Sequence, residues 1–464
     1  MIIMTLIKSI SGIRGTIGQS KGDNLTPEDL VRFTAAYGTW LKRQSQKERG
    51  KVVVGRDARI SGTMVYHIVS GTLLAMGHDV VNLSLATTPT VEIAVTEEKA
   101  DGGIILTASH NPAQWNALKL LNAKGEFLNK QEGEEVLKIA ENESLSYAVV
   151  DELGTERSDE SYLDRHIERI LELPQVDARA IASAGFKVVV DGINSVGGIA
   201  IPRLLEALEV KEVIRVNCDP TGDFAHNPEP LPENLTDMRE AVKTNQADLG
   251  FVVDPDVDRL AIVNEDGTMF GEEYTLVSVA DYVLQQTPGN TVSNLSSTKA
   301  LKELTEERGG QYFPAAVGEV NVVEKMKEKD AVIGGEGNGG VIFPGLHYGR
   351  DALVGVALFL SHLARSGKRC SQLRKQYPFY HISKNKIQLT PEIDVDNVLE
   401  QLKTTFSDYP VNDIDGVKIL FEEGWVHLRK SNTEPIIRVY SEASNEEQAR
   451  ALAQRIIQNV EKIT

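Results

Sequence analysis

The sequence has few cysteines, no long hydrophobic run and less positive than negative charge. No apolar run approaches the roughly 20 residues of a membrane-spanning helix, and the apolar start at 1–7 is too short for a signal peptide. Two distant cysteines, Cys218 and Cys370, suit a reducing compartment better than a disulfide framework. With 49 Lys and Arg against 67 Asp and Glu, the net charge of -18 disfavours nucleic acid and anionic membranes. We therefore expect a cytoplasmic protein with neither partner.

A chain of 464 residues is too long to fold around one hydrophobic core, so we expect three or four domains. Short β-branched runs end in a glycine-rich or acidic loop and are followed by a helical pattern, at 51–62, 186–198, 249–259 and 330–340. This alternation predicts α/β domains with sheets covered by helices and binding loops at the carboxyl ends of strands. The last segment has strand-like runs and then an amphipathic helix from about Asn445, an α+β pattern. Breaks in the pattern predict domains at 1–157, 158–263, 264–375 and 376–464.

The loop "DPDVDR" places Asp254, Asp256 and Asp258 at every second position after an apolar run. If the extended path continues, the three carboxylates share one side and suit Mg²⁺. An EF-hand is the rival interpretation, but Arg259 stands where that loop needs glycine, and a strand precedes it in place of a helix. A solvated acidic turn is the other alternative.

The stretch "GGEGNGG" at 334–340 formally contains the dinucleotide fingerprint G-x-G-x-x-G. That fingerprint requires a helix to begin there, whereas the strand-like "VIFPG" follows. A glycine-rich turn that presents Glu336 and Asn338 to hydroxyl groups fits better, and a purely structural turn is the alternative.

Basic and hydroxyl side chains gather in "RKSNTEPIIR" at 429–438, which predicts a phosphate site. A charged loop that ends a domain is the alternative. Its donors are Arg429, Lys430, Ser431, Asn432, Thr433 and Arg438. Three further positive groups in the first segment are candidates for local phosphate binding: Arg14, Arg56 and Arg59.

The stretch "LTASHNPAQWNALKLL" at 106–121 places Ser109 between two strand-like runs. In an extended or turn segment the side chains of Ser109 and His110 point apart, so we do not expect a nucleophile–base pair. The flanks also lack the G-x-S-x-G of α/β-hydrolases. A serine accompanied by an aspartate trio and a phosphate loop suggests a phosphoryl carrier, and a turn or cap residue is the alternative.

The motifs "TASHNP", "DPDVDR", "GEGNGG" and "RKSNTEPIIR", in this order, resemble those of the α-D-phosphohexomutase family. "SGIRG", "GRDARISG" and "TTPT" add support, so the resemblance covers the whole chain. It implies three related α/β domains with mixed sheets and a C-terminal α+β domain of the TATA-box-binding type, arranged around a central cleft. It also implies an enzyme that interconverts hexose or hexosamine 1-phosphate and 6-phosphate through a phosphoserine and a hexose 1,6-bisphosphate.

The resemblance assigns roles to residues of this sequence. Ser109 is the phosphorylated residue, and Mg²⁺ is held by the phosphoserine with Asp254, Asp256 and Asp258. His110 and Lys119 lie near the reacting oxygens, Arg14 contacts the phosphoserine, and Arg259 is a further active-site residue. Glu336 and Asn338 meet sugar hydroxyls, and the non-reacting phosphate is bound by Arg429, Ser431, Asn432, Thr433 and Arg438.

The chain departs from the family pattern after the sugar-binding glutamate. Where the family usually has Ser-Gly-His, this chain has Asn338, Gly339 and Gly340, so an imidazole is missing. His347 is the nearest candidate substitute, but a strand advances about 3.3 Å per residue, so we expect it well away from the chemistry. Asn432 replaces the usual glycine of the phosphate loop, and Ala117 stands where a glycine often precedes the lysine.

Because of these departures, the substrate can be phosphoglucosamine, phosphomannose or phosphoglucose. The opening "SGIRGTIG" at 11–18 favours phosphoglucosamine. The alternatives are a Mg²⁺-dependent sugar phosphatase or phosphotransferase and a catalytically silent sugar-phosphate binding protein. We expect small sugar phosphates as the binding partners of a monomer or homodimer.

Overall fold

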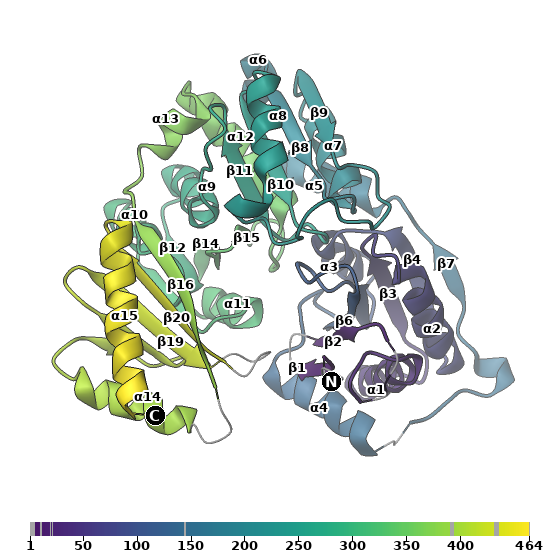
Figure 1. The fold of residues 1–464 in the computed structure, drawn as a ribbon. Helices are drawn as coiled ribbons and strands as arrows, with labels where there is room; N and C mark the ends of the chain where they lie inside the picture. Colours follow the sequence, from purple (N-terminus) through teal and green to yellow (C-terminus); the bar gives the residue numbers. More distant parts are fainter. Residues whose placement is uncertain are drawn as a thin grey trace.

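The computed structural model describes residues 5–9, 12–18, 20, 22–142, 145–389, 394–430 and 436–463. Within these residues the strands form four separate sheets, one in each successive part of the chain. Figure 1 shows the first part, in purple, and the last, in yellow and light green, on opposite sides, with the teal and green parts between them. The predicted α/β fold class with four domains is confirmed, and the exact domain limits stay predictions.

Domain I is built on a seven-stranded mixed sheet in the order β1-β2-β6-β5-β3-β4-β7. Strand β3 pairs in parallel with β4 and β5, whereas β6 runs antiparallel between β5 and β2. The elements are β1(Ile7–Ser9), β2(Gly12–Thr16), α1(Pro27–Ser45), β3(Lys51–Arg56), α2(Gly62–Ala75), β4(Asp79–Leu85), α3(Thr88–Glu97), β5(Gly102–Leu106), β6(Trp115–Leu121), α4(Lys130–Asn142) and β7(Glu156–Ser158).

Domains II and III each contain a four-stranded mixed sheet. The elements of domain II are α5(Tyr162–Glu172), α6(Ala178–Ala184), β8(Lys187–Asp191), α7(Gly197–Ala207), β9(Glu212–Val216), α8(Thr236–Thr244), β10(Leu249–Val253) and β11(Leu260–Asn264). Those of domain III are α9(Glu272–Gln286), β12(Asn290–Asn294), α10(Ala300–Glu307), β13(Tyr312–Ala315), α11(Glu319–Glu328), β14(Ala331–Glu336), β15(Gly340–Ile342), α12(Ala352–Ser366) and α13(Cys370–Arg374). One apolar core joins the two domains, since Phe359 of α12 packs edge-on against Phe251 and Phe270.

The C-terminal domain has a five-stranded antiparallel sheet in the order β16-β20-β19-β18-β17. Figure 1 shows helix α15, in yellow, lying along this sheet, and apolar residues of α14 and α15 share one core with the strands. Helix α15 begins at Glu446, next to the predicted start at Asn445. The elements are β16(His381–Gln388), α14(Val395–Thr405), β17(Val411–Asn412), β18(Val417–Leu420), β19(Gly424–Lys430), β20(Ile436–Ala443) and α15(Glu446–Ile463).

The three α/β domains carry their polar motifs at equivalent places. Strands β5, β10 and β14 each pair in parallel with one neighbour and antiparallel with the strand that follows them, namely β6, β11 and β15. The connections of these pairs contain "TASHNP", "DPDVDR" and "GNG". The helical pattern predicted after 249–259 and 330–340 is therefore wrong, because a strand follows each loop and continues the sheet. Strand β15 agrees with the strand-like "VIFPG" that argued against a dinucleotide fingerprint.

Among the described residues, no helix is long and apolar enough to cross a membrane.

Candidate active site

Ser109 lies in the loop between β5 and β6 and adopts a left-handed backbone conformation, with φ at +49°. Its backbone N–H donates to Thr107 Oγ1 at 2.9 Å, and its hydroxyl donates to Asp254 Oδ2 at 2.8 Å. The turn brings the ring of His110 back, so that Nδ1 lies 3.4 Å from the serine Oγ. The expectation that these two side chains point apart was wrong, because it assumed a path without a left-handed residue.

The buried Arg59 fixes the shape of the serine loop. Its guanidinium donates to four backbone carbonyls of the loop and, through Nε, to Asp57 Oδ2 at 2.9 Å. Those five bonds match the five N–H groups of a guanidinium, so Arg59 is a support of the loop and not the phosphate-binding group that its sequence suggested. Asp57 Oδ2 also accepts the Thr107 hydroxyl at 2.7 Å. The four carbonyls belong to Ser109, Asn111, Pro112 and Trp115.

The three aspartates of the β10–β11 loop are fully buried, and their ligand-type oxygens lie within 4.8 Å of one another. They converge through a turn and not along an extended path: Val257 has φ at +64°, and its N–H donates to the carbonyl of Asp254 at 3.1 Å. Burial and the two neighbouring carboxylates raise the pKa of Asp254 well above its usual value. Such a group of buried charges is costly without a cation.

The aspartate trio fits a hard divalent cation. Oδ1 of Asp256 and Oδ1 of Asp258 are buried and have no hydrogen-bond partner, so each offers an unused lone pair. Carboxylate oxygens with a nearby serine oxygen form the donor set that Mg²⁺ prefers.

Positive side chains surround the trio. Lys119 Nζ lies 2.7 Å from Asp256 Oδ2 and 3.7 Å from Asp258 Oδ2. Burial opposes the charge of Lys119, but the two aspartates outweigh it and raise its pKa. Arg259 Nε lies 3.8 Å from Asp258 Oδ1. This surrounding charge is what an incoming phosphate would meet.

The charge of Arg259 affects the pKa of two neighbouring groups, His110 and Arg14. The charge of Arg259, burial and the charge of Arg14 hold the pKa of His110 well below its usual value. Burial and Arg259 likewise lower the pKa of Arg14. The imidazole beside Ser109 is therefore neutral at pH 7 and can accept a proton.

Glu336 ends strand β14 and is 4% exposed. Its Oε1 accepts bonds from Asn294 Nδ2 at 2.7 Å and from the N–H of Gly318 at 3.1 Å, and its Oε2 accepts one from Arg350 Nη1 at 2.7 Å. Burial opposes ionisation of Glu336, but the charges of Arg350 and Arg259 and the hydrogen bonds from Asn294 and Gly318 together outweigh burial and lower the pKa of Glu336. Asn338 Oδ1 accepts the N–H of Gly340 at 3.2 Å, which shapes the turn.

The sequence analysis missed Arg350 and Glu319, which complete this network. Arg350 also contacts Asp258, so its guanidinium binds a carboxylate of the predicted sugar loop and a carboxylate of the predicted metal loop. The sequence offers one weak indication of the position of Arg350, namely that it precedes Asp351, the residue that caps the apolar helix α12.

Of the predicted phosphate loop, Ser431, Asn432 and Thr433 lie outside the described residues. Arg429 of β19 and Arg438 of β20 are directly opposite partners in the sheet. Arg429 Nη1 lies 3.9 Å from Asp415 Oδ2, and Asp415 Oδ2 accepts the N–H of Val317 at 2.9 Å. The end of this sheet therefore lies next to the segment of domain III whose Gly318 contacts Glu336.

A second buried polar group lies where domains I, II and III meet. His166 Nε2 and His347 Nε2 lie 2.9 and 3.2 Å from Asp351 Oδ2, and His347 Nδ1 lies 3.2 Å from Glu92 Oε2. Although its His and Asp atoms are close enough to hold a metal, these groups bind one another. The polar contacts of His347 are thus with Glu92 and Asp351.

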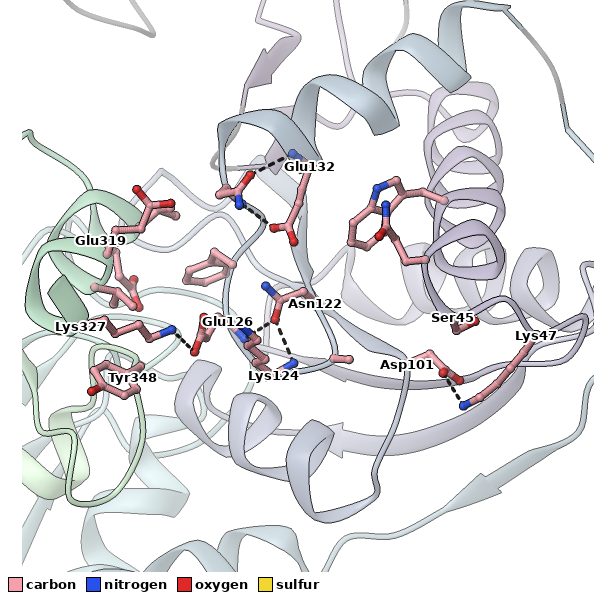
Figure 2. Close-up of a pocket in the computed structure, with 18 residues that line it drawn as sticks. Ser45, Lys47, Asp101, Asn122, Lys124, Glu126, Glu132, Glu319, Lys327 and Tyr348 are labelled. Carbon is pink, nitrogen blue, oxygen red and sulfur yellow. Dashed lines mark hydrogen bonds and ion pairs between the residues drawn. The ribbon is translucent and has the colours of Figure 1, made fainter.

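A pocket of about 580 Å³ lies between domain I and helix α11. Figure 2 shows the side chains that line it. Across it, Lys327 of α11 pairs with Glu126 of domain I. Glu319, at the start of α11, is the residue that this pocket shares with the polar network of Arg350. The pocket therefore lies beside the candidate site and does not contain Ser109 or the aspartate trio.

Four family profiles match almost the whole chain. They are described as phosphoglucomutase/phosphomannomutase alpha/beta/alpha domains I, II and III and the C-terminal domain, and they match residues 6–146, 164–267, 271–380 and 387–459.

Curated relatives have similar lengths. A phosphoglucomutase/phosphomannomutase of Thermococcus kodakarensis is 38% identical over 95% of each chain. A probable phosphoglucosamine mutase of Methanopyrus kandleri is 34% identical over 97% of each chain, and a phosphoglucosamine/phosphogalactosamine mutase of Sulfurisphaera tokodaii is 32% identical over 97% of this chain and 98% of its own.

Solved structures agree in fold. A phosphoglucomutase/phosphomannomutase family protein of Burkholderia thailandensis superposes with a TM-score of 0.86 at 27% identity, covering 100% of this chain and 98% of its own. Aspergillus fumigatus N-acetylphosphoglucosamine mutase, solved with GlcNAc-6P and magnesium, gives a TM-score of 0.57 at 14% identity over 93% of this chain and 97% of its own, which shows the fold alone.

Proposed function

Since the chain belongs to the phosphoglucomutase/phosphomannomutase family of α-D-phosphohexomutases, and is therefore a phosphohexomutase, we propose that Ser109 is its phosphoryl carrier and glucosamine phosphate its sugar substrate. The observation that carries the site assignment is the 2.8 Å contact of Ser109 Oγ with Asp254, inside a buried aspartate trio with two unused oxygens. Asp254, Asp256 and Asp258, together with an oxygen on Ser109, would hold Mg²⁺.

Each half-reaction moves one phosphoryl group and one proton. A sugar hydroxyl attacks the phosphorus of phosphorylated Ser109 and passes its proton to a neighbouring base, while the P–O bond to the serine breaks and the serine oxygen takes up a proton from a neighbouring acid. Bound Mg²⁺ supplies charge neutralisation on the transferred group. We assign proton transfer at the reacting oxygens to His110, whose Nδ1 lies 3.4 Å from Ser109 Oγ, and to Lys119, which binds Asp256 of the trio. Reversal with the other end of the sugar bisphosphate restores the phosphoserine.

The two half-reactions require the sugar to present each end to Ser109 in turn. The opposite end must then be bound by a site that tolerates both orientations. Arg429 and Arg438 are opposite each other on two neighbouring strands. Asp415, which lies beside Arg429, accepts a bond from Val317, so this end of the sheet adjoins the segment that contacts Glu336. We assign the non-reacting phosphate to this pair, with Ser431, Asn432 and Thr433, and the sugar hydroxyls to Glu336 and Asn338.

The choice of glucosamine phosphate rests on the opening "SGIRGTIG" and on the names of the M. kandleri and S. tokodaii relatives. The T. kodakarensis relative, at 38% identity, favours glucose and mannose phosphates as the second candidate.

One experiment separates these functions. The protein is incubated with Mg²⁺, a trace of glucose 1,6-bisphosphate and glucosamine, glucose or mannose 1-phosphate, and the 6-phosphate and inorganic phosphate are followed together. We expect stoichiometric 6-phosphate without inorganic phosphate, with the highest kcat/KM for glucosamine 1-phosphate. Release of inorganic phosphate indicates a phosphatase, and neither product indicates a binding protein. A higher kcat/KM for glucose or mannose 1-phosphate rejects the sugar assignment.

A further inference from the structure

Arg350 is the centre of a buried network of three carboxylates. Its Nη2 lies 2.7 Å from Asp258 Oδ2, its Nη1 lies 2.7 Å from Glu336 Oε2, and its Nε lies 3.1 Å from Glu319 Oε2. The backbone N–H of Arg350 also donates to Glu319 Oε1 at 3.0 Å. Each edge of the guanidinium therefore faces a different acid, and the residue is 8% exposed.

These carboxylates come from separate parts of the fold. Asp258 belongs to the loop between β10 and β11 in domain II, whereas Glu336 ends β14 and Glu319 begins α11 in domain III. Because Arg350 occupies Asp258 Oδ2, the buried Oδ1 of that residue is left as the oxygen without a hydrogen bond. Because Arg350 also binds Glu336, the orientations of the metal-loop and sugar-loop carboxylates depend on one side chain.

The Arg350 side chain passes through the space next to Gly340. A Cβ atom added to Gly340 would lie 2.4 Å from Cδ and 3.1 Å from Cγ of Arg350, well inside van der Waals contact. A long side chain could normally move aside, but here its far end is held by three acids. Gly340 is also the position at which a histidine follows the glutamate in the family pattern. In this chain, the arginine takes the space that a side chain at 340 would need.

We propose that Arg350 is the positioning residue that replaces a side chain at position 340 and fixes Glu336 and Asp258 relative to each other. This rests on the proposed function of the metal and sugar loops. Lysine could not substitute for Arg350, because an ammonium group is compact and lacks the planar fork that reaches three acids at fixed angles. Gly340 and Arg350 therefore form one unit: the glycine leaves room for the arginine, and the arginine orients the two loops.

The first test compares the wild type with Arg350→Lys. We expect the variant to fold, to lose at least tenfold in kcat and to show a several-fold higher KM for the preferred sugar phosphate, since Glu336 loses its fixed orientation. The Kd for Mg²⁺ alone, measured by calorimetry on unphosphorylated protein, should rise at least threefold because Asp258 is no longer held. Unchanged kcat, KM and Mg²⁺ Kd in a folded variant overturn the proposal.

Arg374→Lys is the matched control. Arg374 is also 8% exposed, but it donates to the backbone carbonyls of Phe270 and Tyr377 and not to site carboxylates. Its kinetic constants and Mg²⁺ affinity should stay at the wild-type values. A control that is impaired as strongly as Arg350→Lys would mean that any buried arginine has this effect, and would overturn the specific role.

The second test asks whether a side chain at position 340 and the side chain of Arg350 compete for the same space. It does not require that Arg350→Lys folds well. Gly340→His should lose at least 100-fold in kcat/KM, because its Cβ meets Arg350. Combining it with Arg350→Ala should give at least tenfold more activity than Gly340→His alone. A double variant that shows the product of the two single losses overturns the proposal. The wild type serves as the reference: if it isomerises none of the three sugar 1-phosphates, the proposed function fails, while the Mg²⁺ measurement still tests Arg350.

Discussion

The ammonium group of Lys119 lies 2.7 Å from Oδ2 of Asp256, and the same oxygen accepts the hydroxyl of Thr88 at 2.7 Å. Lys119 is on β6 and Thr88 begins α3, so domain I supplies both partners of an aspartate that belongs to domain II. The backbone N–H of Thr88 also donates to the carbonyl of Asp256 at 2.9 Å. Although burial opposes it, Lys119 and Thr88 hold the pKa of Asp256 below its usual value. Asp256 is thus held in its charged form, as the proposed metal site requires.

Removing the charge of Asp256 should remove metal-dependent catalysis. We expect Asp256→Asn to lose at least 100-fold in turnover, and excess chelator to abolish wild-type activity, because the transferred phosphoryl group loses its counter-charge. The check is the turnover rate against Mg²⁺ concentration, with Asp164→Asn, a surface acid paired with Arg203, as the control. Full activity of Asp256→Asn in excess chelator would contradict the assignment of this loop.

Arg429 and Arg438 are directly opposite on neighbouring strands, so the two guanidiniums concentrate positive charge at one end of the sheet. We expect Arg429→Ala and Arg438→Ala each to raise KM for the sugar phosphate about tenfold, by loss of charge-assisted contacts, and to release bisphosphate during turnover. Unchanged KM together with no free bisphosphate would show that this end of the sheet does not bind substrate.

Arg59 should be intolerant of lysine although the charge is kept. Lysine cannot donate to Asp57 and four loop carbonyls at once, so Arg59→Lys should lower the free energy of unfolding by about 2–4 kcal/mol. Turnover should fall at least 100-fold at a temperature where the variant is folded, because the loop of Ser109 loses its shape. Urea unfolding and steady-state kinetics provide the check, and near-wild-type turnover would disprove the role.

The cluster of His347 and Glu92 should make stability fall at alkaline pH. Burial opposes protonation of His347, but hydrogen bonds to Asp351 and Glu92 raise its pKa to about 9, and burial raises the pKa of Glu92 to about 8. Both groups bind their proton more tightly in the folded state. The contribution of His347 is therefore complete below about pH 6.5 and lost as the pH rises through about 9, and that of Glu92 is lost between about pH 4.5 and 8.

The measurement is urea unfolding between pH 6.5 and 9, where we expect the wild type to lose about 2 kcal/mol more than His347→Gln. Equal pH dependence of the two proteins would contradict the pairing of His347 with Glu92. Because the polar contacts of His347 are with Glu92 and Asp351, His347→Gln should keep most of its turnover. A severe loss of turnover in the folded variant would show that His347 takes part in the chemistry.

The loops of the candidate site could be predicted from the sequence, but the arginines that hold these loops in shape could not. Each loop follows a buried apolar strand, which makes "DPDVDR" and "GEGNGG" visible in the sequence. The aspartates converge, but through a left-handed turn at Val257 that no alternation rule foresees. Arg350 was not predicted and Arg59 was given the wrong role, because the partners of both are set by tertiary contacts: Arg350 meets Asp258 92 residues away, and Arg59 meets the Ser109 loop 50 residues away.

The most direct test of the account is the phosphorylation of Ser109. Intact-mass spectrometry of the purified protein should show a fraction heavier by one phosphoryl group, peptide mapping should place it on Ser109, sugar monophosphate should discharge it and bisphosphate should restore it. Ser109→Ala should keep its circular dichroism and lose both the label and the isomerase activity. A phosphoryl group on another residue, or a Ser109→Ala variant that isomerises sugar phosphate at the wild-type rate, would contradict the account.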